Sequence, residues 1–437
     1  MLGVLALACC RPHGAAADHA GGGCKDDIDC NLNGHCSNAS CVCAAPWGGP
    51  ACDVLQIIPS PVEGAGIYGV APNVTSWGGN IVRWADGKYH LFVSEIAEQC
   101  RFAEWHTNSY VAHAVSDTPD GTYVKAEGKA GVAVQSWAHN PQAIAFGGEL
   151  FLFHIGPGDG TAQTVNCSVS PASPASPASA FPAGFFDGAA WAPPAHRARM
   201  LSEHGVPGSS SSDVRSHRWA ATGRNVVSIR AAPGPDGPWT LVNGTVACDN
   251  PSPLVLRNGT VLLMCSRSPG QGKGPHWRLY SAATPRGPWQ HAAEIFPRSN
   301  RTNDSSEDPF IWEDPNGNLH ALSHTGPRNG DAAQPSTVVS IHGFSRPPFL
   351  TWFWSANQPY GSTIHFADGS STHHATAERP KLVLDGSGNP THLVNGLTNW
   401  QWPCSGCHAK NYTQVCNKCK LTRGKDYTYT IMRVLKQ

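Results

Sequence analysis

A short polar motif recurs five times along the chain, and each copy is followed by two apolar runs that a Gly-containing turn separates. The copies begin at Trp77, His139, Asp249, Glu307 and Glu378. The turns include Asp86-Gly87, Asn258-Gly259 and Asn316-Gly317. These dipeptides between apolar runs are strong hairpin signals. Five copies of one motif and hairpin predict a single domain built from five similar structural units.

A second element recurs between the copies, at residues 114–123, 231–239 and 282–289, with a weaker form at 342–349. Each has an apolar run, a Pro/Gly turn and an aromatic residue that starts the next run. One unit is therefore predicted to contain four strands joined as two hairpins.

The motif starts are 62, 110, 58 and 71 residues apart. Blade-type repeats are about 40–50 residues long, so these units carry loops. The longest interval contains residues 168–212, which are rich in Ser, Pro and Ala and are expected to form a loop insert. The repeat predicts an all-β fold with a five-bladed β-propeller over residues 66–437.

The composition agrees with many short strands, because Gly (46) and Pro (36) are frequent. Lys+Arg and Asp+Glu are equal at 31 each. Zero net charge without a basic run argues against nucleic acid or an anionic membrane as the partner. No apolar run of about 18 residues occurs, so no transmembrane segment is expected.

Cysteine usage points to an oxidising compartment, since the chain has 16 Cys. Glycosylation sequons of the form N-x-[ST] occur at Asn38, Asn73, Asn166, Asn243, Asn258, Asn300, Asn303 and Asn411. Residues 1–17 are similar to a short secretory signal peptide. We therefore expect a secreted or lumenal glycoprotein.

Six cysteines fall within residues 20–53, ending in C-x-C, Trp47-Gly48 and a final Cys. This pattern resembles an EGF-like module, a class that commonly mediates extracellular protein contacts. By that resemblance the disulfides are Cys24–Cys36, Cys30–Cys41 and Cys43–Cys52. Zinc binding is the alternative reading of this cluster.

Other cysteines are less constrained by the sequence. Residues 401–422 form a Cys-rich insert with Cys404, Cys407, Cys416 and Cys419 in a CxxC…CxxC arrangement. Such a pair reads as two local disulfides in a secreted protein and as a zinc knuckle in an intracellular one. Cys248 and Cys265 flank one hairpin and are predicted to pair, which leaves Cys100 and Cys167 over.

In a propeller the first strand of each blade lines the central channel, so the five motifs are expected to converge on one pocket. The polar residues that they supply are Asn80, His139, Asn140, Asp249, Asn250, Glu307, Asp308, Glu378 and Arg379. The alternative is that these side chains cap loops or hydrogen-bond one blade to the next.

The motifs, together with the Pro-x-Gly-Pro-aromatic element, resemble the five-bladed propeller glycosidases of glycoside hydrolase family 43. The resemblance covers residues 66–437 and implies three carboxylates: a base Asp on the first blade, a second Asp and a Glu acid. Asn80 stands where the base is expected, and an amide cannot accept a proton. Hence Glu378 or Glu307 is predicted as the acid and Asp249 or Asp308 as the base. Two separated carboxylates would suit inverting hydrolysis, and neighbouring ones push their pKa values apart.

Further residues are predicted to bind the substrate. Trp77 and Trp105 offer faces on which sugars stack, and Glu95 is a first-blade substitute for the missing carboxylate. Arg379 is expected to hold a carboxylate or a sugar hydroxyl, or to pair with Glu307 or Asp308. No cofactor is required, although the resemblance implies a structural calcium held through a His and waters.

Two functions therefore follow from the sequence. The first is a secreted hydrolase of oligosaccharides, polysaccharides or glycans. The second is a glycan-binding or adhesion protein on a glycosidase scaffold that has lost catalysis.

Overall fold

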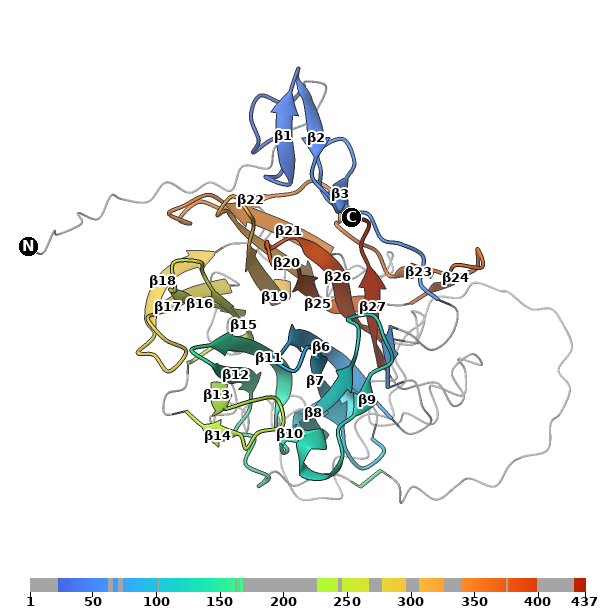
Figure 1. Cartoon of the computed structure of the whole chain (residues 1–437), viewed down its shortest axis with the longest axis vertical. Coiled ribbons are helices and arrows are strands. Elements are labelled where there is room, and N and C mark those ends of the chain that lie inside the picture. Colours follow the sequence, from blue (N-terminus) through green and yellow to red (C-terminus); the bar gives the residue numbers. More distant parts are fainter. Residues whose placement is uncertain are drawn as a thin grey trace, which may run out of the picture.

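The computed structural model confirms an all-β chain with five sheets arranged as a ring (Figure 1). The structure describes residues 23–61, 66–69, 74–100, 102–161, 164, 166–167, 226–242, 246–266, 277–295, 306–325, 340–374, 376–398 and 428–437. The predicted signal peptide at 1–17, the insert at 168–212 and the cysteines of 401–422 lie outside these residues. None of the described helices is long and apolar enough to cross a membrane.

The strands follow the predicted units. Blade 1 contains β6 (Ser76–Arg83), β7 (Tyr89–Ile96), β8 (Ser109–Ser116), β9 (Val124–Lys125) and β10 (Val132–Val134). Blade 2 contains β11 (His139–Phe146), β12 (Glu149–Ile155), β13 (Val227–Ala232) and β14 (Thr240–Leu241). Blade 3 contains β15 (Asp249–Val255), β16 (Val261–Ser266), β17 (Trp277–Ala282) and β18 (Gln290–Ile295). Blade 4 contains β19 (Ser306–Glu313), β20 (Leu319–Thr325), β21 (Ser340–Ser345) and β22 (Phe353–Trp354).

The fifth blade closes the ring with a strand from the other end of the chain. It contains β25 (Thr376–Leu384), β26 (Pro390–Thr398), β27 (Tyr429–Val434) and β5 (Ile67–Tyr68). In this sheet β27 is third and β5 is fourth. Pairing of Thr430 with Tyr68 thus ties the two ends of the propeller together.

The turn residues explain the first hairpin of most blades. Gly87, Gly259 and Gly317 adopt φ values of 82°, 85° and 83°, a region that favours glycine. In two of these turns the side chain before the glycine accepts a backbone hydrogen bond: Asp86 Oδ1 from the Lys88 N–H at 3.0 Å and Asn258 Oδ1 from the Thr260 N–H at 2.9 Å. Local sequence therefore sets the register of these hairpins.

The first strands of the five blades lie beside one another in a closed circle, β6–β11–β15–β19–β25 and back to β6. Side chains at the fourth motif position, which are Asn80, Gln142, Ser252, Phe310 and Lys381, link several neighbours. Asn80 donates to Ala143 O at 3.1 Å and accepts from the Ala143 N–H at 2.8 Å. Lys381 Nζ donates to Pro309 O at 3.1 Å. These bonds join adjacent inner strands without any shared ladder.

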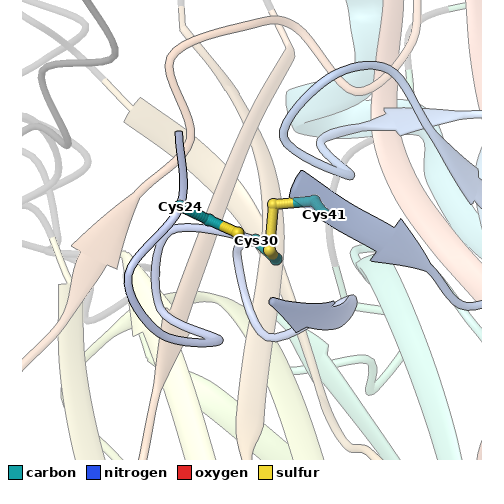
Figure 2. A group of neighbouring side chains, drawn as sticks. All are labelled: Cys24, Cys30 and Cys41. Atoms are coloured by element: carbon teal, nitrogen blue, oxygen red, sulfur yellow. A yellow bond between two sulfur atoms is a disulfide. The ribbon is translucent and has the colours of Figure 1, made fainter. Parts of the chain in front are cut away.

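A disulfide-rich module precedes the propeller and projects from the ring near β21 and β22 (Figure 1). It consists of the pairs β1 (Gly34–Ser37) with β2 (Ser40–Cys43) and β3 (Trp47–Gly48) with β4 (Val54–Leu55). The implied disulfides are present as Cys24–Cys36, Cys30–Cys41 and Cys43–Cys52. Figure 2 shows Cys24, Cys30 and Cys41 close together, with a sulfur–sulfur bond from Cys30 to Cys41. Because all three sulfurs are in disulfides, this cluster offers no thiolate for zinc.

The module packs on blade 4 through aromatic and polar contacts. The Trp47 ring lies 4.8 Å from His342 and 6.5 Å from Trp312, between ring centroids. Ser355 Oγ donates to Asn31 Oδ1 at 2.9 Å. The remaining described disulfides are Cys248–Cys265, as predicted, and Cys100–Cys167, which joins the two leftover cysteines.

The two hydrogen bonds between the Asn80 amide and the Ala143 backbone yield a stability prediction. Asn80→Ala leaves the N–H and C=O of Ala143 without their partner, and each lost buried hydrogen bond costs about 1 kcal/mol. We expect a loss of about 2 kcal/mol in the free energy of unfolding, measured by urea denaturation. The exposed turn variant Asn316→Ala is the control and should stay within about 0.5 kcal/mol of the wild type. Equal stability of both variants would show that these two hydrogen bonds do not stabilise the fold.

Candidate functional site

Each inner strand carries a β-bulge at the same place in its repeat. The register shifts lie between Trp77 and Asn80, His139 and Gln142, Asp249 and Ser252, Glu307 and Phe310, and Glu378 and Lys381. The second motif residues, Gly78, Asn140, Asn250, Asp308 and Arg379, have φ values of 60°, 58°, 50°, 57° and 52°. A bulge redirects a side chain that regular pleating would place elsewhere. Fivefold use of one bulge thus brings these residues together at the channel.

The second motif residues form a buried polar cluster. Arg379 Nη1 donates to Asp308 Oδ1 at 2.8 Å, and His324 Nε2 lies 2.9 Å from Asp308 Oδ2. Asn140 Nδ2 donates to Asn250 Oδ1 and lies 3.4 Å from Asp308 Oδ1. Blades 2 to 5 are thereby connected through side chains alone.

Blade 1 contributes space rather than a polar group. A Cβ at Gly78 would lie 2.8 Å from both Cδ and Nε of Arg379, closer than real Cβ contacts. Gly78 therefore permits the Arg379 side chain to lie across the first blade. This explains why the first copy of the motif has glycine where the others have a side chain.

The cluster fixes one ionised carboxylate. Burial raises the pKa of Asp308, but the charges of Arg379 and His324 outweigh it and hold that pKa well below its usual range. Burial lowers the pKa of His324, whereas the negative charges of Glu378 and Asp308 raise it to about 9. At neutral pH the group is therefore an Arg379–Asp308–His324 arrangement of cation, anion and cation.

The first motif residues place three carboxyl groups on blades 3 to 5. Burial, followed by the charge of Asp308, raises the pKa of Asp249 to about 7. Burial and the negative charge of Asp308 also raise the pKa values of Glu307, to about 7, and of Glu378. Glu307 nevertheless keeps an exposed surface, whereas Asp249 and Glu378 are half-buried. At a pKa of about 7, Asp249 and Glu307 are each protonated in a large fraction of molecules near neutral pH, whereas an ordinary carboxyl group would have lost its proton.

Aromatic rings occupy the blade 1 and 2 side. Phe102, in the turn η1 (Phe102–Glu104), lies 4.2 Å from Trp77 between ring centroids. Trp105, in α1 (Trp105–Asn108), lies 4.8 Å from His139. Trp77 is 2% exposed, so the rings of this wall that keep accessible surface belong to Phe102 and Trp105. The sequence missed Phe102, whose only signal is its place in the loop after the first hairpin.

His139 completes this side as a neutral group. Burial lowers its pKa well below the usual range, and Ser109 Oγ lies 2.7 Å from its Nδ1. The ring is therefore a hydrogen-bonding and packing group rather than a cation. The sequence does not single out His324 among the histidines, and its place near the end of β20 is what brings it to Asp308.

Two predicted residues lie elsewhere. Asn80 is the counterpart of Gln142 and Lys381, not of the motif's first acidic residue, and its amide is used by Ala143. The first-blade counterpart of Asp249 is Trp77. Glu95 accepts hydrogen bonds from the hydroxyls of Tyr68 and Tyr110, and Lys125 Nζ lies 2.6 Å from its Oε2. Its oxygens are thus committed to holding β5 and blade 1 together.

The residues do not fit the calcium ion that the resemblance implied. Single ligand atoms of Asp308, His324 and Glu378 lie within 4.8 Å of one another. Calcium takes about six to eight oxygen ligands, whereas both oxygens of Asp308 already face Arg379 and His324. A guanidinium at this point repels a further cation and neutralises the carboxylate itself.

The ion pair carries a first prediction for this site. Arg379→Met should lower stability by about 3–5 kcal/mol, because Asp308 stays charged and buried without its main partner. The double variant Arg379→Met/Asp308→Asn should be more stable than Arg379→Met alone. Chemical denaturation of both single variants and the double variant measures this coupling. Strictly additive losses would refute it.

Metal addition tests the poor fit to calcium. Melting temperatures in 5 mM calcium and in excess EDTA should agree within about 1 °C, since an ion at 100 times its Kd adds about 2.7 kcal/mol to stability. A clear upward shift in calcium would show that Arg379 does not exclude the ion. Magnesium serves as the matched control.

No protein-family model matches the chain, and no curated protein does. Solved structures with a similar fold include a family 117 glycoside hydrolase of Zobellia galactanivorans, at 12% identity over 88% of this chain and 91% of that one, with a TM-score of 0.47. An alpha-L-arabinofuranosidase of Podospora anserina matches at 10% identity over 88% and 98%, with a TM-score of 0.48. An endo-arabinase of Bacteroides thetaiotaomicron matches at 12% identity over 87% and 98%, with a TM-score of 0.42. At these values no activity is transferred from them to this chain.

Proposed function

We propose that this chain binds a carbohydrate at the motif end of the propeller channel and hydrolyses a glycosidic bond there. The observation that supports it is the trio of carboxyl groups with raised pKa values, Asp249, Glu307 and Glu378. Aromatic rings of Phe102 and Trp105 lie on the other blades of the same end. Sugars combine apolar C–H faces with hydroxyls, so rings and carboxylates suit them jointly.

Roles can be proposed from exposure and charge. Glu307 is the general acid, because it is exposed and a pKa of about 7 leaves a large protonated fraction near neutral pH. Asp249 is the base, since a pKa of about 7 leaves a large ionised fraction there. Glu307 would donate its proton to the glycosidic oxygen as the bond to the anomeric carbon breaks. Asp249 would take a proton from the water that attacks that carbon.

Asp308 and Glu378 have supporting roles in this proposal. Asp308 is locked by Arg379 and His324, so it acts as a fixed charge rather than as the attacking base. Glu378 Oε2 lies 3.9 Å from His324 Nε2 and is placed to accept a substrate hydroxyl beside the cleavage point.

Binding without cleavage is the second candidate. It is favoured by blade 1, where Trp77 and Gly78 stand at the two motif positions that carry acids or polar groups elsewhere. A hydrolase on this scaffold must draw its base from another blade. Whether Asp249 meets that requirement decides between the two functions.

We also propose a secreted location. The five described disulfides are compatible with an oxidising compartment. Residues 1–17 would direct export, and the EGF-like module at 20–53 would contact extracellular proteins.

Removing the proposed acid tests hydrolysis. Glu307→Gln should lower kcat/KM by about 10²–10⁴, the range for a lost general acid. Release of reducing sugar and of nitrophenol from a panel of nitrophenyl glycosides measures the rate. The exposed loop variant Glu127→Gln is the matched control and should keep full activity.

The pH profile should be bell-shaped and centred near 7 for the wild type. Activity falls at lower pH as Asp249 gains a proton and at higher pH as Glu307 loses one. Glu307→Gln should lose the alkaline limb of residual activity. Binding on a glycan array with no release of sugar by the wild type would instead support the binding protein.

A further inference from the structure

Arg433 is a buried cation that has no role in the function proposed for the channel. It lies on β27 with 3% of its surface exposed. Nη2 donates to Asn395 Oδ1 at 2.6 Å and Nη1 to Gly361 O at 3.3 Å, while Nε has no hydrogen-bond partner. The guanidinium also lies 5.5 Å from the Tyr360 ring centroid. Among the described residues, no carboxylate pairs with it.

This arrangement differs from the other buried cations of the inner blades. Arg379 has Asp308 as its counter-charge at 2.8 Å. Lys381 has no carboxylate partner in the part of the chain that the structure describes, but burial lowers its pKa well below the usual range, so the amine can be neutral. A guanidinium stays charged in proteins, and burial lowers the pKa of Arg433 only to about 10. Buried charges are normally paired, so Arg433 requires a counter-charge from outside the described chain.

A cavity opens on this side chain. It has a volume of about 440 Å³ and lies between the linker at 54–60 and the segments at 358–361 and 363–365, with Arg433 in its wall. That volume falls within the ~300–1,000 Å³ range of ligand pockets. None of the first or second motif residues lines it.

The walls of the cavity are held in place by backbone hydrogen bonds. The Leu55 N–H donates to Pro359 O at 2.8 Å, and the Ser60 N–H donates to His365 O at 2.8 Å. The Ile58 N–H donates to Val434 O at 2.9 Å, which fixes the linker against the strand of Arg433. The pocket is therefore formed by the folded chain itself.

Polar and apolar side chains both line the cavity. Apolar surface comes from Val54, Ile57, Pro59 and Ile364, and polar groups come from Gln358, Thr363 and His365. Such a mixture suits a ligand with C–H faces and hydroxyl groups, and the cation adds a demand for negative charge.

We propose that this cavity binds an acidic monosaccharide unit, whose carboxylate becomes the counter-charge of Arg433. The charge of the Arg433 guanidinium in the cavity wall would attract that carboxylate, and the polar wall would take the hydroxyls. This binding does not depend on whether a glycosidic bond is cleaved at the motif end of the channel.

Calorimetric titration of the full chain with D-glucuronate tests this, with D-glucose as the match that lacks the carboxylate. We expect saturable heat with glucuronate and at least a tenfold weaker response with glucose. Raising the salt concentration should weaken the glucuronate response, because the attraction is electrostatic.

Two variants locate the binding. Ile58, which is 44% exposed and lines the cavity, can be enlarged as Ile58→Trp to fill it without touching Arg433. Ile58→Trp should lose glucuronate binding, and Arg433→Gln should weaken it at least tenfold if it folds. Trp105→Ala, at the motif end of the channel, should keep glucuronate binding. Equal responses to the two sugars, no response to glucuronate, or loss of binding in Trp105→Ala alone would overturn the proposal.

Discussion

The ion pair between Arg379 and Asp308 is the interaction on which the candidate site depends. It joins blade 5 to blade 4 where no sheet hydrogen bond connects them. Because Asp308 is held as an anion, neighbouring carboxyl groups meet an existing negative charge and keep their protons more readily. One buried pair therefore supplies both a mechanical link and the electrostatic difference between the acids. Removing a charge from it would change the protonation of residues that Arg379 does not touch.

Most of the fold could be predicted from the sequence because each blade repeats local signals. Asp-Gly and Asn-Gly turns specify hairpins within a few residues, and the motif period counts the blades. Closure by β5 could not be predicted, since Ile67–Tyr68 is too short to carry a pattern. The Cys100–Cys167 disulfide likewise depends on a spatial approach across 67 residues, which spacing does not encode.

The site was predictable only where the motif kept its form. Asp249, Glu307 and Glu378 occupy equivalent first positions, and the structure brings them to one end of the channel. In blade 1 the dipeptide Gly78-Gly79 replaces the residue-proline step, so the sequence alone drew attention to Asn80 rather than to Trp77. The bulge registers correct this, because Asn80 pairs with Phe92 as Gln142 pairs with Phe153. The reason for Gly78, space for Arg379, exists only between blades.

The same requirement, that a buried charge has a partner nearby, applies in the channel and in the peripheral cavity. A chain with 31 basic and 31 acidic residues can pair its charges on average, but pairing is local and a buried guanidinium cannot borrow a distant carboxylate. Arg379 has its anion within the ring, and Lys381 can shed its proton. Arg433 has neither outlet among the described residues and lies in the wall of a cavity, where a ligand from solvent can balance its charge. An acidic ligand would balance its charge by the same rule by which Asp308 balances the charge of Arg379: in a buried site the anion must lie close to the guanidinium.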